Sequence, residues 1–146
     1  MQSLGPVGGE PVVFVTKHRV RFREVDMYGH MNMAHYLTYF QDHRFEGMRN
    51  HLQLGIEELL ALPIAFHIRA VEIEYLLPML ADQEFTIKSF VTEWKSAQCY
   101  VALHLLRSDN EMAATGKMRV GCIEKVTGRP CMWPEGIRER FYVSES

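Results

Sequence analysis

The sequence lacks the signatures of several protein classes. Its three cysteines, at positions 99, 122 and 131, form no CxxC pair, which argues against a disulfide framework or a structural zinc site and favours the reducing cytoplasm. No apolar run approaches the roughly 20 residues that cross a bilayer. The formal net charge is only -2 with both signs interspersed, so the basic footprint of a nucleic-acid-binding protein is missing. The motifs GxSxG, GxxxxGK[ST] and GxGxxG are also absent, which removes a serine nucleophile elbow and the usual nucleotide-binding loops.

What is present is the composition of one globular domain. The chain has 146 residues, of which 47% are hydrophobic and 23% are charged, and natural domains peak at about 100–150 residues. We therefore expect a single domain over residues 1–146. The N-terminal stretch MQSLGPVGGEP has neither the basic patch nor the apolar core of a secretory signal, so residues 1–11 are predicted to form a flexible tail.

Hydrophobic periodicity predicts the first half of the fold. Residues 11–22, PVVFVTKHRVRF, alternate as a strand with one partly wet face. From Met33 to about Asn50 the apolar residues recur at helical spacing, which predicts an amphipathic helix with Asn32 as its N-cap. A short second helix over Ile56–Ala61 ends before Pro63, because the residue preceding a proline disfavours the α conformation.

The second half of the chain reads as strands. The alternation after Pro63 changes phase near Ala70, which implies a bulge. Three more strands are predicted over residues 85–94, 97–107 and 112–126. A strand, a long helix and an antiparallel run of strands indicate an α+β protein. An antiparallel sheet wrapped around one long central helix buries both the helix stripe and the strand faces, and this is the hotdog fold.

The segment before the long helix, RFREVDMYGHMNMAHY, carries the candidate chemistry. The first N–H groups of a helix lack internal partners and lie at the positive end of its dipole, so they can hold a developing oxyanion. Asp26 lies close enough in sequence to act on a carbonyl bound there. It could attack the acyl carbon directly, giving a mixed anhydride, or orient and deprotonate water. This arrangement favours thioester cleavage with Asp26 as the catalytic residue.

Several neighbours of Asp26 have two interpretations. Asn32 is either only a helix cap or a cap that also touches substrate, and His30 either contacts the thioester or Asp26 or simply holds the loop. Tyr36 fits packing better than substrate contact. His30 and His35 lie five residues apart and so fall on different helix faces, unlike the i, i+4 pair of a zinc helix. We therefore expect no metal and no cofactor.

The same region resembles a known family. The run RVRFREVDMYGHMNMAHYLTYF is similar to the signature of the 4-hydroxybenzoyl-CoA thioesterase family of hotdog proteins, in which an Asp precedes a Gly by three residues and a Tyr by about ten; Asp26, Gly29 and Tyr36 match. EYLLPMLADQEF and EWKSAQCYV resemble two further family segments, so the likeness spans roughly residues 18–125. It implies a homodimer or homotetramer that hydrolyses acyl-CoA without a metal, at sites on the subunit boundary. It also implies that Asp26 is the catalytic carboxylate.

The candidate substrate-binding residues follow from both arguments and are Gly29, His30, Asn32, Met33, Tyr36 and Lys95. Many relatives carry a second Asn where this chain has Met33, which leaves the local hydrogen bonding and the preferred acyl group open. Lys95, in a predicted hairpin turn, is the candidate for binding the CoA phosphates. Its competitors are Arg69, Lys117 and Arg119.

The acyl group itself is not specified by the sequence. Candidate lining residues suit an aromatic or an aliphatic chain equally: Phe66, Tyr75, Leu76, Leu77 and Met79. The thioester partner is either CoA or an acyl carrier. The alternative function is a non-catalytic acyl-CoA or acyl-carrier binding module, favoured by Met33 and by the absence of a second obvious acid–base residue.

Overall fold

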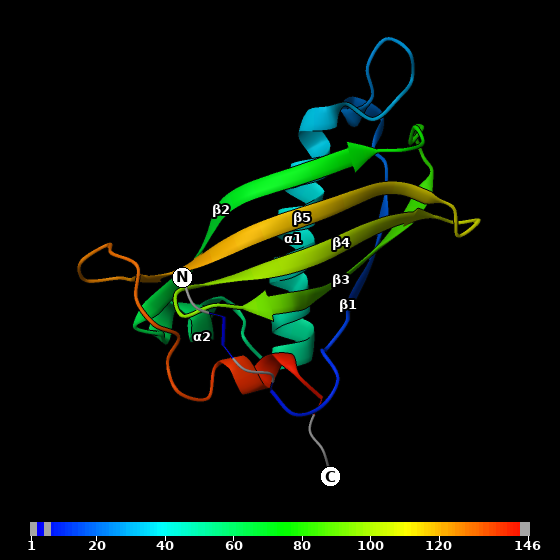
Figure 1. Ribbon diagram of the computed structural model, residues 1–146. Coiled ribbons are helices and arrows are strands. Elements are labelled where there is room, and N and C mark those ends of the chain that lie inside the picture. The colour runs from blue at the N-terminus through cyan, green and yellow to red at the C-terminus, as the bar shows by residue number, and fades with distance from the viewer. Residues whose placement is uncertain (1–2, 5–6, 144–146) are drawn as a thin grey trace.

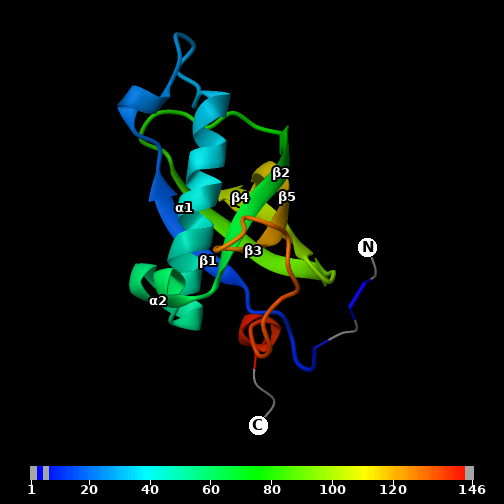
Figure 2. The same cartoon turned by 90° about the vertical axis from the view of Figure 1, so that its left-hand side faces the viewer.

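A five-stranded antiparallel sheet lies against one long helix in the computed structural model, which describes residues 3–4 and 7–143 (Figure 1). The strand order is β1-β3-β4-β5-β2, so β1 and β2 form the two edges. Figure 2, turned by 90°, shows α1 packed along one side of the sheet. The predicted hotdog fold is confirmed. Its elements are β1 (Phe14–Arg19), η1 (Phe22–Glu24), α1 (Met33–Leu52), α2 (Ile56–Ala61), β2 (Ile64–Tyr75), β3 (Glu84–Trp94), β4 (Gln98–Arg107), β5 (Met112–Glu124) and η2 (Arg138–Phe141).

Helix α1 begins where its cap was predicted. The Asn32 side-chain oxygen accepts a hydrogen bond from the Ala34 N–H at 3.1 Å, and the helix ends at Gln53, which adopts the left-handed conformation. Its buried face is formed by Tyr36, Phe40, His43, Gly47, Met48 and Leu52. Met33 and Leu37, expected in the apolar stripe, are instead 65% and 37% exposed. In the same turns Tyr36 is buried against Tyr75 at the end of β2, whereas Met33 and Leu37 remain open to solvent at the end of α1 that extends beyond the sheet (Figure 1).

Strand β1 is shorter than the predicted strand over residues 11–22. Its last residue, Arg19, pairs with Glu84, the first residue of β3. Beyond this pair only Val20 still bonds to the turn before β3, to the Gln83 carbonyl at 2.9 Å and from the Asp82 N–H at 2.8 Å. The chain then turns into η1, and Phe22 is 86% exposed. The predicted second helix Ile56–Ala61 and the phase change of β2, between Ile68 and Ala70, are both confirmed.

The predicted N-terminal tail, residues 1–11, lies partly outside the described residues. In the described part of the tail, the Leu4 N–H donates to the Trp94 carbonyl at 2.9 Å. Pro11 forms an isolated β-bridge with Tyr142. The structure therefore attaches both of these points to the fold. Among the described helices, none combines the length and the apolar character needed to span a membrane.

A polar network crosses the apolar core between α1 and the sheet. His43 on α1 is fully buried, and its two ring nitrogens lie 2.6 Å from the hydroxyl oxygens of Thr16 on β1 and Ser89 on β3. His18 also contacts the Thr16 hydroxyl, at 2.6 Å. Because every ring nitrogen of His43 has a partner, the imidazole is accommodated at modest cost.

Candidate active site

The loop that holds Asp26 is closed by its own backbone. The Asp26 N–H donates to the His30 carbonyl at 2.9 Å, and the Gly29 N–H donates to the Asp26 carbonyl at 3.0 Å. Gly29 has a φ of +77°, which a residue with a side chain adopts only with strain. The sequence therefore needs glycine at the turn that returns the chain toward α1.

The two carboxylate oxygens of Asp26 have different roles. Oδ1 accepts hydrogen bonds from the backbone N–H groups of Tyr28 at 2.9 Å and His30 at 3.2 Å, a local turn that fixes the side chain. Oδ2 has no hydrogen-bond partner among the described residues, and Asp26 is exposed. One oxygen is thus used for orientation while the other is available to a ligand or a water molecule.

The start of α1 provides hydrogen-bond donors at the same place. Asn32 uses its side-chain oxygen to cap the Ala34 N–H and its own N–H to bond the Glu24 carbonyl at 2.8 Å. Within the described chain, the Met33 N–H is left without a partner. This backbone donor and the Asn32 side-chain amide nitrogen are available to a developing oxyanion.

A cavity of about 580 Å³ brings most of the predicted residues together. Asp26, His30, Asn32, Met33 and Tyr36 all line it, whereas Gly29 does not. Its opposite wall comes from the end of β2 and the following turn, namely Tyr75, Leu76, Leu77 and Pro78. Three of the five predicted acyl-lining residues are therefore here; Phe66 lines a different cavity, and Met79 is buried in the core.

The aromatic residues at this cavity support its shape. Tyr36 is buried and packs edge-on against Tyr75, with ring centroids 4.8 Å apart. Burial raises the pKa of the Tyr36 phenol, so it stays protonated at neutral pH. The His30 ring has no hydrogen-bond partner within the described residues, so the loop is held by the His30 backbone and not by its imidazole.

The Asp26 loop is positioned by Glu24, which the sequence did not single out, together with Tyr39. Glu24 is buried and accepts hydrogen bonds from the Arg21 N–H at 2.8 Å and from the Tyr39 hydroxyl on α1. Burial and the bond to Glu24 both raise the pKa of Tyr39. Glu24 thereby ties the segment before Asp26 to the helix. No local pattern in the sequence distinguishes this buried glutamate from the surface charges around it.

Lys95 does not join this group within one chain. It follows Trp94 at the far end of β3, whereas His30 bridges to Leu80, just before the start of that strand. The 11 residues of β3 separate the two ends by about 36 Å. The Lys95 ammonium instead lies 5.6 Å from the Tyr100 ring, which Lys117 also approaches, at 5.4 Å. Of the other competitors, Arg119 and Arg69 line a separate small hollow on the sheet.

The described residues contain no group of side chains arranged to bind a metal ion. No cluster of three or more His, Cys, Asp and Glu side chains is placed there to hold a metal ion. Cys99 and Cys122 are buried, and burial raises the pKa of each thiol to about 12. Both thiols are therefore protonated at neutral pH and poorly suited to attack a thioester.

Comparison with known proteins identifies the family. Residues 20–141 match the sequence profile of the Thioesterase-like superfamily. The acyl-CoA thioester hydrolase YbgC of Escherichia coli O157:H7 is 23% identical over 123 residues, 84% of this chain and 91% of that protein. The long-chain acyl-CoA thioesterase FadM of Escherichia coli K12 is 24% identical over 127 residues, 86% of this chain and 95% of FadM.

Solved structures share the fold of this chain. The crystal structure of SAV2348 from Staphylococcus aureus, solved in complex with CoA, superposes with a TM-score of 0.80 at 18% identity, over 97% of this chain and 92% of that one. The profile covers most of the chain and includes the Asp26 loop, α1 and all of the sheet after β1. The chain therefore belongs to the Thioesterase-like superfamily and is a thioester hydrolase with the hotdog fold.

Proposed function

We propose that this protein hydrolyses acyl-CoA thioesters, with Asp26 as the catalytic carboxylate. The proposal rests on the two carboxylate oxygens of Asp26. Oδ1 accepts the hydrogen bonds that hold the loop, whereas Oδ2 has no partner within the described structure. Asp26 lines the same cavity as the start of α1. The names of the relatives YbgC and FadM support acyl-CoA as the substrate class.

The proposed reaction needs an attacking oxygen and donors for the oxyanion. In the general-base route, a water oxygen bonds to the acyl carbon while its proton passes to Asp26. The C–S bond then breaks, the proton ends on the departing thiolate, and the products are the free acid and CoA. In the nucleophilic route, Asp26 bonds to the acyl carbon, the C–S bond breaks and the CoA thiolate leaves. Water then cleaves the mixed anhydride, which releases the acid and restores the Asp26 carboxylate, and a proton from that water ends on the thiolate. In both routes the Met33 N–H and the Asn32 amide stabilise the negative oxygen.

The protein is proposed to act as a homodimer or homotetramer in the cytoplasm. The outer edge of β2, twelve residues long, pairs with no other strand of the described chain, and such edges are usually covered. Antiparallel pairing of two β2 edges would bring the Ile64 end of one chain beside the Tyr75 end of its partner. In that arrangement a cation such as Lys95 would serve the partner's site.

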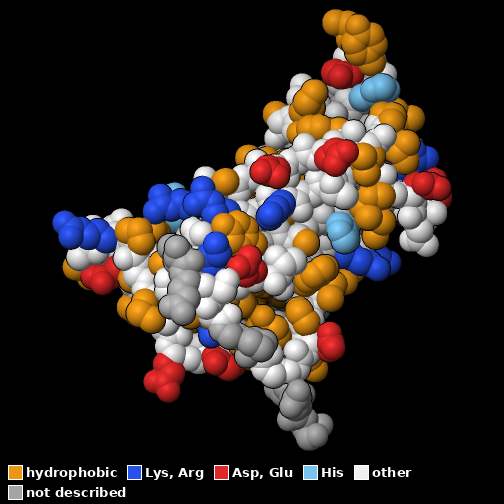
Figure 3. All heavy atoms as spheres, in the orientation of Figure 1, with side chains coloured by type: hydrophobic (Ala, Val, Ile, Leu, Met, Phe, Trp, Pro, Cys, Tyr) orange, Lys and Arg blue, Asp and Glu red, His pale blue; other side chains and the backbone are white. Residues whose placement is uncertain are grey.

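Exposed apolar side chains near the site fit the same assembly. Met27 and Tyr28, at the tip of the Asp26 loop, are 89% and 76% exposed, and Met33 is 65% exposed. Figure 3 shows apolar side chains projecting at the end of the molecule where Figure 1 places this loop. Contiguous apolar surface of this kind is typical of protein or ligand contacts. Light scattering is expected to give a dimer or tetramer, and a fully active monomer would contradict this part of the proposal.

A turnover panel tests the function. Purified protein is incubated with acetyl-, decanoyl-, palmitoyl- and 4-hydroxybenzoyl-CoA, and released thiol is followed with a colour reagent. We expect steady turnover of at least one of these thioesters. Calorimetric binding of acyl-CoA without turnover over hours would instead establish the non-catalytic binding module. Parallel assays with the matching acyl-carrier thioester distinguish the two carriers.

A further inference from the structure

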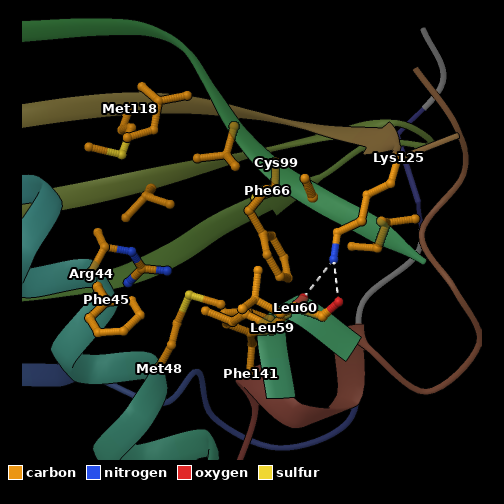
Figure 4. Close-up of a pocket in the computed structure, with 15 residues that line it drawn as sticks. Arg44, Phe45, Met48, Leu59, Leu60, Phe66, Cys99, Met118, Lys125 and Phe141 are labelled. Atoms are coloured by element: carbon orange, nitrogen blue, oxygen red, sulfur yellow. Dashed lines mark hydrogen bonds between the residues drawn. The ribbon is translucent and has the colours of Figure 1, made fainter. Parts of the chain in front are cut away.

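A second cavity, of about 310 Å³, lies inside the chain at the other end of α1 (Figure 4). It is enclosed by the second half of α1, α2, β2, β4, β5 and η2, and its lining is mostly apolar. Met48, Ile64, Phe66, Met118 and Phe141 are among the residues that line it. It shares no lining residue with the cavity at Asp26. The Asp26 chemistry therefore leaves this space unexplained.

One charged lining residue points into the interior of the cavity. Arg44 projects from α1, and Figure 4 shows its guanidinium pointing into the space between Met48, Met118 and Phe66. Burial lowers the pKa of Arg44 to about 10, which still leaves it charged at neutral pH. No carboxylate of the described chain forms an ion pair with it. Arg44 is half-buried. A partly desolvated cation without a counter-ion is unfavourable, so an anion entering the cavity would gain from meeting it.

The contacts of Arg44 within the chain leave most of its donors available. One terminal nitrogen donates to the Ser89 hydroxyl at 2.9 Å, and the guanidinium stacks 4.3 Å from the Phe14 ring centroid. These contacts fix the orientation of the guanidinium from one side. A guanidinium has five N–H donors, and two of them can bind a carboxylate side by side. The fixed orientation therefore presents a preorganised fork to the cavity.

The cavity has an identifiable mouth. Of its lining residues only Leu60 and Lys125 are exposed. The Lys125 ammonium donates to the carbonyls of Leu59 and Leu60, at 2.9 Å each, and so closes the end of α2 against β5 (Figure 4). A ligand that enters beside Leu60 would pass apolar walls before it meets Arg44. The geometry thus suits a molecule with an apolar body and an anionic end.

We propose that this cavity binds an apolar carboxylic acid whose carboxylate pairs with Arg44. Two sources have this chemistry: a free carboxylic acid, such as the product of thioester hydrolysis, and the distal carboxylate of an acyl group derived from a dicarboxylic acid. The second source rests on the proposed function, whereas binding of the free acid does not. The volume, about 310 Å³, lies at the lower end of the roughly 300–1,000 Å³ typical of small-molecule sites.

Calorimetry with a matched ligand pair tests the site. Decanoate and decanamide have the same chain and differ at the head group in charge. We expect the wild-type protein to bind decanoate at least about tenfold more tightly, because hydrogen bonds between charged groups are the stronger class. In Arg44→Met the two affinities become equal while decanamide binding is retained. Arg49→Met, an exposed arginine on the same helix, keeps the wild-type preference.

Two further measurements place the ligand. Methionine-methyl NMR of the wild-type protein should show decanoate shifting Met48 and Met118 and leaving Met33 unchanged, and this reading stands even if Arg44→Met fails to fold. Val101→Phe, at a buried lining position of β4, fills the cavity and should abolish binding of both ligands. Equal affinities in the wild-type protein, undetectable decanoate binding, or a carboxylate preference that survives in Arg44→Met would overturn the proposal.

Turnover then separates the two sources. If the distal carboxylate is the natural ligand, Arg44→Met lowers kcat/KM for sebacoyl-CoA at least about tenfold and leaves decanoyl-CoA unchanged. If the free acid is the ligand, both thioesters are hydrolysed as before while decanoate binding is lost. Absence of any turnover in the wild-type protein would refute the proposed function, but the calorimetric test of acid binding at Arg44 would still stand.

Discussion

His43 should make the stability of this protein depend on pH in a calculable way. Its imidazole is fully buried between Thr16 and Ser89. Burial, followed by the positive charge of Arg44 and the neighbouring His18 and His51, lowers the pKa of His43 to about 3. In the unfolded chain the same group titrates near 6.5. Between these two values the unfolded state binds a proton that the folded state does not.

The sign and size of the effect follow from this difference. Stability contributed by neutral His43 is complete above pH 6.5 and is lost progressively as the pH falls toward about 3. At pH 5 about 97% of the unfolded chains carry the proton, which corresponds to a loss of about 2 kcal/mol in the free energy of unfolding relative to pH 7.5. Burial also lowers the pKa of His18, opposed by the carboxylates of Glu46 and Asp42, so His18 acts in the same direction.

Urea unfolding at pH 7.5 and pH 5 measures this loss. The wild-type protein should lose about 2 kcal/mol more than His43→Gln over this interval, since the variant has no imidazole to protonate. His67→Gln, at an exposed position of β2, serves as the control and should follow the wild type. NMR of the wild-type protein should show that the His43 ring does not titrate above pH 5. Parallel losses in the wild type and His43→Gln would refute the reasoning.

Two other substitutions test the packing and the cap. Gly47→Ala would place its Cβ 2.7 Å from the Phe14 Cβ, so we expect a loss of about 1–3 kcal/mol in urea unfolding despite alanine's better helix propensity; an unchanged midpoint would contradict this packing. Asn32→Ala removes the cap on the Ala34 N–H and should cost about 1 kcal/mol in thermal unfolding, with Asn32→Asp restoring it; equal melting of all three proteins would contradict the capping role.

Local rules in the sequence predicted the parts of the fold that depend on near neighbours. Pro63 marked the end of α2, the phase change at Ala70 marked the bulge in β2, and Asn32 marked the start of α1. The length of β1 was not predictable in this way, because it depends on where its partner β3 begins. Local alternation describes a strand and says nothing about the length of the strand beside it.

The candidate functional residues show the same difference between local and long-range information. Asp26 and Asn32 could be predicted to lie at one cavity because the whole loop and helix start are contiguous in sequence. The positions of the buried Glu24 and the half-buried Arg44 were not predicted, since each depends on residues from distant segments, Tyr39 for Glu24 and Ser89 for Arg44. A charged residue that is buried by tertiary packing has the same local pattern as one on the surface.

Asp26→Asn is the most direct test of the central claim. Asparagine keeps the Oδ1 acceptor that holds the Tyr28 and His30 N–H groups, and it replaces Oδ2 by an uncharged NH2 group that can neither attack the acyl carbon nor accept a proton. Asp109→Asn is a matched control, because Asp109 accepts a similar bond from the Glu111 N–H at 3.0 Å and does not line the Asp26 cavity. With the best acyl-CoA substrate, Asp26→Asn should lower kcat at least about 100-fold while its Tm and acyl-CoA affinity match those of Asp109→Asn. Activity of Asp26→Asn equal to that of the control would show that Asp26 only shapes the loop.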